Sequence, residues 1–477
     1  MSASVTVPQK KNRTVTDSFG QTYELTGKLG EGGQGTVCTT NHPNVLVKVA
    51  RKASKEKLIN WVGKIERLMR SPLTGLPIAK PLARIVSPQP GYVMELMDGL
   101  VQLSVLMQES ADALSEDSGL QVYIQNGGLL RRLRILARLS RVLAELHSRG
   151  LTYGDLSPTN VFVSKSLEYA EVWLIDSDNI DSQSRDSAQG VFTPDYGAPE
   201  ILRGESGINT LTDSWSFAVL AYNLLIMAHP LKGDIVLEGE PEMEDAALRG
   251  ALPWVDHPTD QSNELTLSGL PRTLVLNTAI SELFERCFNL GLVDSAERPS
   301  LSEWAEGFEA SVARILQCAE CNSSYFYKSK SKLVCPFCDF VNNPNSMLLL
   351  QEYFYLPPEL LREKVGDVPE DLILKNCWVR TGGWQVLTEA TIQLKSLLPG
   401  DSLYLDDKSL CSMTLDRDGL RIVPSLGSFV SIQKDKGAEV KAITSPLQFK
   451  TQHRAGVSYW LHLGVALEAH YVWQFTW

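Results

Sequence analysis

The stretch YGDLSPTNVFVS, residues 153–164, places an aspartate and an asparagine five positions apart, ahead of an apolar run of strand type. A carboxylate can accept a proton and an amide oxygen can bind a metal ion, so Asp155 and Asn160 would suit the catalytic loop of a phosphotransferase. The same two residues also occur in ordinary surface turns. The interpretation therefore depends on the groups that lie on either side of this stretch, and on their order.

A glycine-rich segment lies upstream. In GKLGEGGQGTVCTT, Gly30, Gly32 and Gly35 form G-x-G-x-x-G and Val37 follows two positions later. Glycines let backbone N–H groups approach phosphate oxygens, and Val37 could cover a nucleotide base. The pattern alone is weak evidence, because turns use glycine freely. It is no Walker loop, because Gly-Lys-Ser/Thr is missing, and the strand NVLVKVA follows where a Rossmann fold needs a helix.

A lysine in the next strand is the third component. Lys48 alternates with Val47 and Val49, so its amine points away from the core, toward the phosphates of a bound nucleotide. Glu66 follows 18 residues later in a helical stretch and is expected to hold Lys48 by an ion pair. Glu56 is the competing choice, but it is too close in sequence to belong to a separate packed helix. Without the glycines, a surface strand lysine would be the better interpretation.

This order of groups resembles the eukaryotic-type protein kinase family, which has a glycine loop, a strand lysine and a helix glutamate at about these spacings. GYVMELMDG resembles the family's hinge, with Met94 as gatekeeper and the Glu95–Met97 backbone facing adenine. The resemblance implies that Asp155 is the base for the substrate hydroxyl. It also implies that Asn160 and Asp176, the latter in VWLIDSDN, bind Mg²⁺ or Mn²⁺ beside ATP.

Three later segments extend the resemblance. FTPDYGAPE matches the substrate-binding end of the family's activation segment, and its Thr193 is expected to bond to Asp155. TDSWSFAVL supplies Asp213 at the head of a buried helix. ERPSLSEW supplies Arg298, which the resemblance pairs with Glu200. The implied fold is the bilobal α+β protein kinase fold.

The loops also depart from the family pattern. Tyr153-Gly154 replaces the usual His-Arg, Ser157 replaces a lysine near the transferred phosphate, and Asp176-Ser177-Asp178 replaces Asp-Phe-Gly. Every group that touches the metal or the reacting hydroxyl is nevertheless present. We therefore predict an ATP-dependent protein kinase acting on Ser or Thr. The alternative is a pseudokinase scaffold that binds nucleotide or partners without phosphoryl transfer.

Loss of the loop arginine affects the expected control. An arginine before the catalytic aspartate usually holds a phosphorylated activation loop. Gly154 offers no such group, so a phosphate on Ser182, Ser184 or Ser187 is expected to find no partner there. We expect control to come from elsewhere, such as the appended C-terminal modules.

A second constellation follows the kinase-like region. CAECNSSYFYKSKSKLVCPFCD contains two Cys-x2-Cys hooks separated by 13 residues, Cys318 and Cys321 followed by Cys335 and Cys338. Four thiolates at this spacing predict a structural Zn²⁺ in a zinc ribbon, with no open position for catalysis. We expect this ribbon to fold as a unit of its own. Alternating lysines between the hooks, such as Lys328, are more typical of a solvated hairpin than of a nucleic-acid contact.

The remaining C-terminal region has short alternating runs separated by turn residues, which predict a β-rich, sandwich-like domain. His453, His462 and His470 are interpreted as ordinary sheet or surface histidines. The signatures of a forkhead-associated domain are absent. The predicted organisation is: N-lobe 21–97, C-lobe 98–315, zinc ribbon 316–340, helical linker 341–375 and β-rich domain 376–477.

This architecture is similar to that of bacterial kinases found with tellurium-resistance-type proteins. The similarity implies a von Willebrand-type domain protein and a metal-dependent protein phosphatase as partners. The net charge of −11 argues against nucleic acid as a general partner. The beginning of the sequence lacks the apolar core of a signal peptide, and the longest apolar stretch, residues 217–228, is too short to span a membrane. A cytoplasmic location is expected.

Overall fold

The computed structural model describes residues 13–31, 35–95, 97–115, 119–167, 169–182, 192–266, 268–329, 333–366, 368–395, 409–436 and 438–477. The chain forms two compact units that do not follow the order of the sequence. The first contains the described parts of Met1–Gly119, Arg138–Gly269 and Glu282–Ala305. The second contains the described parts of Leu120–Ala137, Leu270–Ser281 and Glu306–Trp477.

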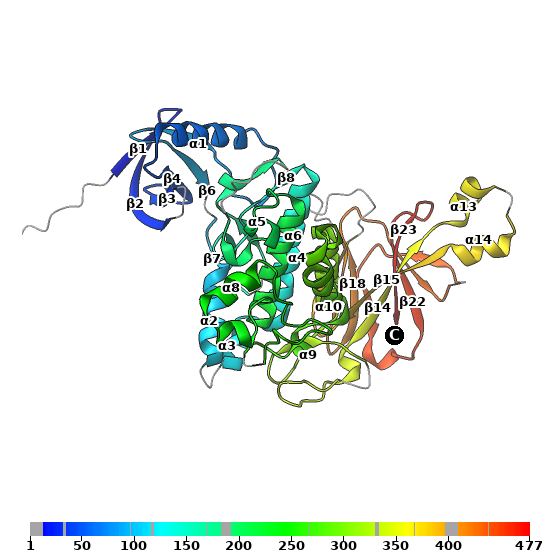
Figure 1. Cartoon of the computed structure of the whole chain (residues 1–477). Coiled ribbons are helices and arrows are strands. Elements are labelled where there is room, and N and C mark those ends of the chain that lie inside the picture. Colours follow the sequence, from blue (N-terminus) through cyan, green and yellow to red (C-terminus); the bar gives the residue numbers. More distant parts are fainter. Residues whose placement is uncertain are drawn as a thin grey trace, which may run out of the picture. The chain divides into compact units, whose positions relative to one another are not determined.

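The first unit begins with a small β-barrel and one helix (Figure 1). Six antiparallel strands close in the order β1-β2-β3-β4-β6-β5. Strand alternation divides the barrel residues between two cores: Val47 and Val49 pack inside it, whereas Leu46 and Met94 pack with Ile65 of the helix. The elements are β1 (Arg13–Asp17), β2 (Thr22–Glu31), β3 (Gly35–Thr40), β4 (Val45–Ala50), α1 (Lys55–Leu68), β5 (Ala83–Ser87) and β6 (Gly91–Glu95).

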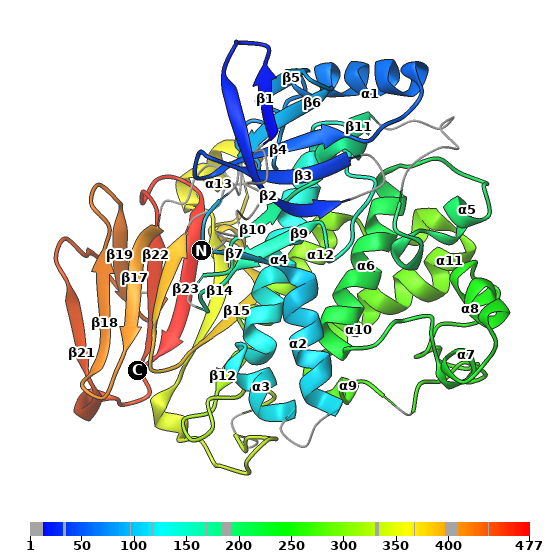
Figure 2. The same ribbon diagram turned by 90° about the vertical axis from the view of Figure 1, so that its left-hand side faces the viewer.

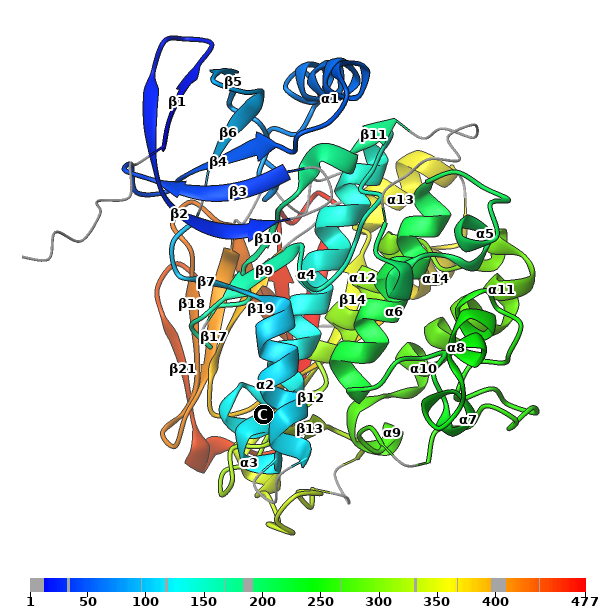
Figure 3. The same cartoon turned by 60° about the vertical axis from the view of Figure 1, so that its left-hand side comes forward.

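The middle of the chain is mainly helical, as its periodicity predicts. The apolar stretch at 217–228 lies mostly in α6 (Figure 3). Asn209 caps this helix, and most of its residues are buried. The helices are α2 (Leu103–Ser115), α3 (Gly119–Gln125), α4 (Gly128–Ser148), α5 (Pro199–Leu202), α6 (Thr210–Ile226), α7 (Asp234–Leu237), α8 (Pro241–Leu248), α9 (Arg272–Val275), α10 (Thr278–Glu285), α11 (Gly291–Val293) and α12 (Leu301–Val312). The strands are β7 (Leu100–Gln102), β8 (Leu151–Thr152), β9 (Val161–Ser164), β10 (Val172–Leu174) and β11 (Asp181–Ser182).

None of the helices in the described part of the chain combines the length and the apolar character that crossing a membrane would require.

The second unit contains a β-sandwich, which confirms the sandwich-like prediction (Figure 2). A six-stranded sheet has the order β15-β14-β23-β22-β19-β20 and a four-stranded sheet the order β16-β17-β18-β21. Their facing side chains share one apolar core, in which Leu350 and Phe475 of the first sheet join Met413 and Ile422 of the second. The strands are β12 (Ile315–Gln317), β13 (Ser324–Phe326), β14 (Leu348–Tyr355), β15 (Trp378–Leu387), β16 (Thr391–Lys395), β17 (Ser409–Leu415), β18 (Gly419–Pro424), β19 (Val430–Lys434), β20 (Val440–Ala442), β21 (Leu447–Lys450), β22 (Ser458–Leu463) and β23 (His470–Thr476).

The predicted helical linker at 341–375 is only partly helical. Helices α13 (Pro358–Val365) and α14 (Glu370–Asn376) are present, but residues 348–355 form β14, which lies between β15 and β23 in the sheet. The Pro-Pro pair that follows ends this strand and does not mark a connector. The β-domain therefore begins near residue 348 and not at 376.

The predicted boundaries of the C-lobe also differ from the compact units. Residues 120–137 and 270–281 belong to the second unit. Two hydrogen bonds tie them there: Leu130 N donates to Ser324 Oγ at 3.0 Å, and Asn277 Nδ2 donates to Ser311 Oγ at 2.8 Å. Such contacts join residues far apart in the chain, so a linear reading of the sequence assigns them to the wrong unit.

Two histidines predicted to be ordinary are a buried pair. His462 on β22 and His470 on β23 are each 3% exposed, and their rings are in hydrogen-bond contact at 2.9 Å from Nδ1 to Nε2. Burial lowers the pKa of His462 to about 3, with His470 adding to the effect. Burial also lowers the pKa of His470. Because the folded protein disfavours protonation of both, their contribution to stability is present above the unfolded-state pKa and is lost as pH falls below it.

We predict that the β-sandwich loses stability between pH 7 and pH 5. For His462 alone, an unfolded pKa of about 6.5 gives a loss of about 2 kcal/mol at pH 5. Hydrogen exchange of β22 and β23 peptides, corrected for the intrinsic pH dependence, measures this loss in the full chain. In a His462→Gln/His470→Gln variant, the free energy of unfolding should depend less on pH. In His453→Gln, which changes an exposed histidine, it should depend on pH as in the wild type. Equal acid sensitivity in the wild type and the double variant would contradict the prediction.

Candidate active site

Lys48 occupies the centre of the site. It lies on β4, opposite Val37 of β3 and Tyr92 of β6, and its side chain is only 2% exposed. Its ammonium forms ion pairs with Asp176 and with Asp178, the latter at 2.8 Å. Burial lowers the pKa of Lys48, but the charges of Asp178 and Asp176 outweigh it and the net pKa is raised. The lysine is therefore held as a cation.

The expected ion pair between Lys48 and Glu66 is not formed, and that prediction was wrong. The Glu66 carboxylate lies 3.1 Å from Arg70 and 3.5 Å from Arg84, at the edge of the unit. The cause is helical geometry. The inward face of α1 carries Ile65 and Leu68, and Glu66 is about 100° around the helix from Ile65.

The predicted base and its neighbours lie together. Asp155 Oδ1 accepts hydrogen bonds from the backbone N–H of Thr193 at 2.8 Å and from its hydroxyl at 2.9 Å, so the expected Thr193–Asp155 contact is confirmed. Asn160 Nδ2 donates to the Asp155 carbonyl at 2.8 Å, which leaves the amide oxygen of Asn160 for another partner. Burial raises the pKa of Asp155, and the Thr193 hydrogen bonds oppose this rise.

The backbone of the catalytic loop is fixed by Asp213. Its buried carboxylate accepts the N–H groups of Tyr153 at 2.7 Å and Gly154 at 2.9 Å, and it lies 3.0 Å from His147. Gly154 has φ +85° and lies close to Ile208, so a residue with a side chain would be strained there. Tyr153 donates from its hydroxyl to the carbonyl of Ile175, which links the loop to the segment before Asp176.

Each residue of the Asp176-Ser177-Asp178 segment has its own partners. Asp176 adopts φ 57°, the left-handed region, and a 3₁₀ turn follows at Ser177–Asn179. Ser177, where the family has a phenylalanine, donates from its buried hydroxyl to the Ala79 carbonyl at 2.8 Å. The Ile175 N–H donates to the Asn160 carbonyl at 2.9 Å, which places Asp176 next to Asn160 in the site.

Asp178 is the site residue that the sequence analysis missed. Its carboxylate has no exposed surface and accepts from Trp61 Nε1 at 3.0 Å and from the Tyr92 hydroxyl at 2.5 Å, in addition to Lys48. Trp61 lies four residues before Ile65 on the inward face of α1. The sequence contained this signal, because the i, i+4, i+7 spacing of Trp61, Ile65 and Leu68 marks the face directed at the site.

The predicted nucleotide-covering residues lie on β2, β3 and the hinge. Gly30 and Gly35 belong to β2 and β3, whereas Gly32 lies outside the described residues. A Cβ on Gly35 would lie 2.5 Å from the Val49 carbonyl oxygen, so only glycine fits this close crossing of strands. At the hinge, the gatekeeper position Met94 is buried, whereas Glu95 and Met97 are exposed.

The base of the substrate segment is held by an ion pair that the sequence predicted. Arg298 donates two parallel hydrogen bonds to Glu200, from Nη1 to Oε1 at 2.7 Å and from Nη2 to Oε2 at 2.9 Å. Arg298 is 1% exposed and stacks over the Trp215 ring at 4.8 Å. The expected Arg298–Glu200 pair is therefore confirmed.

The start of the activation segment has basic neighbours that the sequence analysis did not anticipate. Lys64 and Arg67 of α1 line a small cavity of about 160 Å³ together with Asp181 and Ser182, and Arg67 lies 3.0 Å from Asp181. Gly154 carries no group that could hold a phosphate on Ser182, whereas Lys64 and Arg67 are basic residues that line the same cavity as Ser182. The expectation that control comes from elsewhere stays a prediction. Ser184 and Ser187 lie outside the described residues.

Comparison with known proteins agrees with this geometry. A family model described as the protein kinase domain matches residues 23–306, more than half of the chain. The chain belongs to the protein kinase family. The β-barrel with α1 is accordingly the N-lobe of a bilobal kinase fold, and the mainly helical region that follows in the sequence is its C-lobe.

Several relatives carry the names of protein kinases. The chain is 29% identical to the serine/threonine-protein kinase pkn2 of Myxococcus xanthus over 222 residues, which are 45% of this chain and 25% of the relative. It is 27% identical to PknD of Chlamydia caviae over 237 residues, 44% of this chain and 25% of the relative. It is also 38% identical to the human protein kinase C delta type over 120 residues, 24% of this chain and 17% of the relative. The kinase spans about a quarter or less of the length of these relatives.

The four predicted metal-ligating cysteines form a second site in the kinase's C-terminal unit. The sulfur atoms all lie within 4.8 Å of one another, with Sγ–Sγ distances of 3.6 Å from Cys318 to Cys338 and 3.7 Å from Cys321 to Cys335. Four sulfurs at about 2.3 Å from one zinc ion in a tetrahedron would be about 3.8 Å apart. The arrangement therefore fits a closed, four-coordinate metal centre.

Two matching turns position these cysteines. Asn322 N donates to the Cys318 carbonyl and Asp339 N to the Cys335 carbonyl, each at 3.0 Å. Both Asn322 and Asp339 adopt a left-handed backbone conformation. Each hook therefore forms a tight turn around its cysteines, and in the second hook the N–H of Phe337 donates to Cys335 Sγ at 3.4 Å.

The cysteine hairpin shares its apolar core with the β-sandwich, so the expectation of an independently folded ribbon was wrong. Cys318, Tyr325 and Leu333 pack with Met347, just before β14, and with Val386 of β15. Fewer than 30 residues cannot enclose a core of their own, and here the missing apolar surface comes from the neighbouring sheet.

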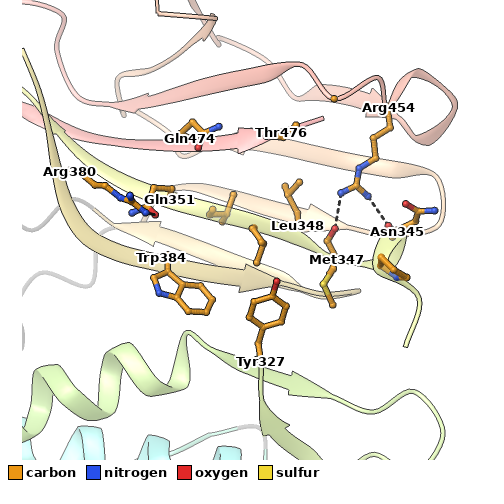
Figure 4. Close-up of a pocket in the computed structure, with 14 residues that line it drawn as sticks. Tyr327, Asn345, Met347, Leu348, Gln351, Arg380, Trp384, Arg454, Gln474 and Thr476 are labelled. Atoms are coloured by element: carbon orange, nitrogen blue, oxygen red, sulfur yellow. Dashed lines mark hydrogen bonds between the residues drawn. The ribbon is translucent and has the colours of Figure 1, made fainter. Parts of the chain in front are cut away.

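A cavity of about 630 Å³ lies against the six-stranded sheet in the same unit (Figure 4). Its walls combine Met347 and Leu349 with the rings of Tyr327 and Trp384. Arg454 lies at one end, where it donates to the carbonyls of Asn345 and Met347 at 2.8 Å, and Arg380 donates to Gln351 at 2.7 Å. The cavity therefore has an apolar floor with cationic groups in its lining.

We predict that removal of the buried Arg298–Glu200 pair strongly destabilises the kinase. Arg298→Met leaves Glu200 as an unpaired, largely buried carboxylate, and such losses cost about 3–5 kcal/mol. Arg70→Met, at the exposed partner of Glu66, should cost less than about 1 kcal/mol. Chemical unfolding followed by hydrogen exchange of α6 peptides measures both. Similar losses for the two variants would contradict the assignment of Arg298 as a structural anchor.

Proposed function

We propose that the chain is an ATP-dependent protein kinase that transfers the γ-phosphoryl group to a Ser or Thr hydroxyl of a protein. One observation carries the proposal: a continuous path of contacts joins the four required groups. Lys48 pairs with Asp176, Asp176 adjoins Asn160 through the Ile175 hydrogen bond, and Asn160 bonds to Asp155. Such positioning, with little covalent work for the protein, is what phosphoryl transfer requires.

In the proposed reaction the substrate hydroxyl oxygen attacks the γ-phosphorus, and the bond from that phosphorus to the β–γ bridging oxygen breaks, so ADP leaves. Asp155 accepts the hydroxyl proton. Thr193 bonds to its carboxylate and Asn160 to its backbone carbonyl, which supports a fixed orientation of Asp155. Lys48 is placed to hold the phosphates, because its ammonium is kept charged inside the site. Gly30, Gly32, Gly35 and Val37 are proposed to cover the nucleotide, and the Glu95–Met97 backbone to face the adenine.

The donors at the site fit a divalent metal. The Asp176 carboxylate is 25% exposed, and the amide nitrogen of Asn160 is bonded to Asp155, which directs the amide oxygen elsewhere. Carboxylate and amide oxygens are ligands that suit Mg²⁺ or Mn²⁺. Asp176 and Asn160 are therefore proposed to hold the ion, which would supply positive charge to the phosphates when bound.

A protein substrate is supported by the activation-segment end FTPDYGAPE, residues 192–200. In the family this segment forms the peptide platform, and here Thr193 bonds to Asp155 while Glu200 is anchored by Arg298. A small-molecule kinase would not need such a platform. The names of the relatives support Ser or Thr as acceptor.

The competing proposal is a scaffold that binds nucleotide or partners without transfer. Its support is the replacement of the loop lysine by Ser157, whose side chain is buried and bonded to Thr159 at 2.9 Å. Ser157 thus brings no positive charge to the transferred phosphate. The two proposals differ in their expectations for metal-dependent nucleotide binding and for phosphoryl transfer.

The C-terminal unit is proposed to carry a structural Zn²⁺ and to make partner or regulatory contacts. The cysteine geometry supports the ion, and the cavity beside Trp384 offers a surface for a partner. The likeness in architecture to tellurium-resistance-associated bacterial kinases supports a von Willebrand-type domain protein and a metal-dependent phosphatase as partners to test.

We predict that wild-type protein transfers labelled phosphate from ATP to itself or to a protein substrate, and that Asp155→Asn lowers the rate by at least about 10²-fold. Lys48→Met should have an effect of similar size. Thermal shift should show stabilisation by ATP only when Mg²⁺ or Mn²⁺ is present. Equal labelling by the wild type and both variants would reject the kinase proposal, and absence of any nucleotide shift would favour the scaffold.

We also predict that protein purified without chelator contains one zinc per chain. Cys335→Ser should release the zinc. Because Met347 and Val386 belong to the core of the hairpin, the segments around them should also become more accessible to protease. Metal analysis and limited proteolysis measure the two effects. Cys377→Ser, a buried cysteine away from the cluster, serves as control and should retain the metal. Zinc-free wild-type protein would overturn the assignment.

A further inference from the structure

Lys48 has two anionic partners with different surroundings. Asp176 is 25% exposed and belongs to the proposed metal site, whereas the Asp178 carboxylate has no exposed surface. Asp178 is therefore closed to solvent. If Asp176 held a metal ion, Asp178 would be the carboxylate that remains paired with the lysine.

Three donors hold the Asp178 carboxylate in position. Lys48 Nζ lies 2.8 Å from Oδ2, Trp61 Nε1 donates to the same oxygen at 3.0 Å, and the Tyr92 hydroxyl donates to Oδ1 at 2.5 Å. Trp61 and Tyr92 also stack, with ring centroids 6.0 Å apart. These donors satisfy both oxygens and so fix the direction of the carboxylate.

The residue expected to anchor the lysine is engaged elsewhere. Glu66 contacts Arg70 and Arg84 at the edge of the unit, on a different face of α1 from Trp61. Glu66 follows Trp61 by five positions, which places the two residues about 140° apart around the helix. Rotation of α1 that brought Glu66 inward would remove Trp61 from Asp178.

We propose that Asp178 is the positioning residue for Lys48, in the place that the family gives to a helix glutamate, with Trp61 and Tyr92 holding it. This inference rests on the proposed function, because it assigns the group that prepares Lys48 for the phosphates of ATP. The anchor of the lysine and the proposed metal ligand Asp176 then belong to one three-residue segment. Helix α1 is coupled to this segment through the indole of Trp61 and not through a carboxylate of its own.

The matched pair Asp178→Asn and Glu66→Gln tests the inference, because each removes one negative charge with little change in volume. We expect Asp178→Asn to weaken binding of a fluorescent ADP analogue in the presence of Mg²⁺ by at least about ten-fold and to lower kcat for ATP by at least as much. Glu66→Gln should change both by less than about two-fold, since its carboxylate pairs with Arg70 and Arg84 and not with Lys48. Melting temperatures without nucleotide separate these effects from unfolding.

A charge exchange provides the readout that a purely structural role would not give. Trp61→Glu/Asp178→Gly moves the carboxylate from the segment to the inward face of α1, and should bind the ADP analogue more tightly than Asp178→Gly alone. If Asp178→Asn does not fold, Tyr92→Phe and Trp61→Phe each remove one donor from the carboxylate and should weaken nucleotide binding in the same direction.

The outcomes distinguish the two proposals. Suppose that the wild type binds nucleotide or transfers phosphate. If Glu66→Gln then lowers nucleotide binding and kcat more than Asp178→Asn does, the role of Asp178 is overturned and the proposed function is left intact. A wild type that neither binds nucleotide nor transfers phosphate would remove the proposed function and, with it, the role of Asp178. Loss of nucleotide binding in Asp178→Asn with partial recovery in the exchange variant supports the inference.

Discussion

A buried ammonium ion has to be matched by negative charge, and this constraint on Lys48 organises the N-lobe and the loops around it. Removing a charge from water costs several kcal/mol unless a counter-charge and hydrogen bonds replace the lost solvent. Here two carboxylates of one short segment provide the counter-charge, and both must lie within reach of β4. The position of this segment is fixed in turn by the Tyr153 hydroxyl, which bonds to the Ile175 carbonyl, and by Ser177, which bonds to Ala79.

The residues that meet at the candidate site could be located from the sequence because they lie in short motifs with a fixed order. Contacts between motifs were also predictable where residue type specified them: a threonine hydroxyl for Asp155, and an arginine for Glu200. The partner of Lys48 was not, because separation along the chain does not show which face of a helix a residue occupies. Glu66 has the right chemistry but lies on a face of α1 that is not directed at Lys48. Trp61 lies on the face that is directed at the site.

The C-terminal unit shows the same division between local and non-local information. Alternating runs correctly predicted a sandwich, and the cysteine spacing correctly brought four sulfurs together. The sequence could not show that residues 120–137 and 270–281 belong to this unit, because those contacts link distant segments. Strand β14 was missed because a helix and a Pro-Pro pair follow it closely. Its place between two other strands of the sheet depends on β15 and β23, which come later in the chain.

In the sequence, the departures from the family's loops are residues that lack the usual side chains. In the structure, the residues that replace them have hydrogen-bond or ion-pair partners of their own. Phenylalanine gives way to Ser177, whose hydroxyl has a carbonyl partner, and glycine gives way to Asp178, whose carboxylate has three donors. A buried ion pair adds little net stability compared with apolar side chains of similar volume. Stability alone therefore gives no reason to gather Lys48, Asp176 and Asp178 in one ion-pair cluster. The raised pKa values of Lys48 and of Asp155, the candidate base, are instead typical of a functional site.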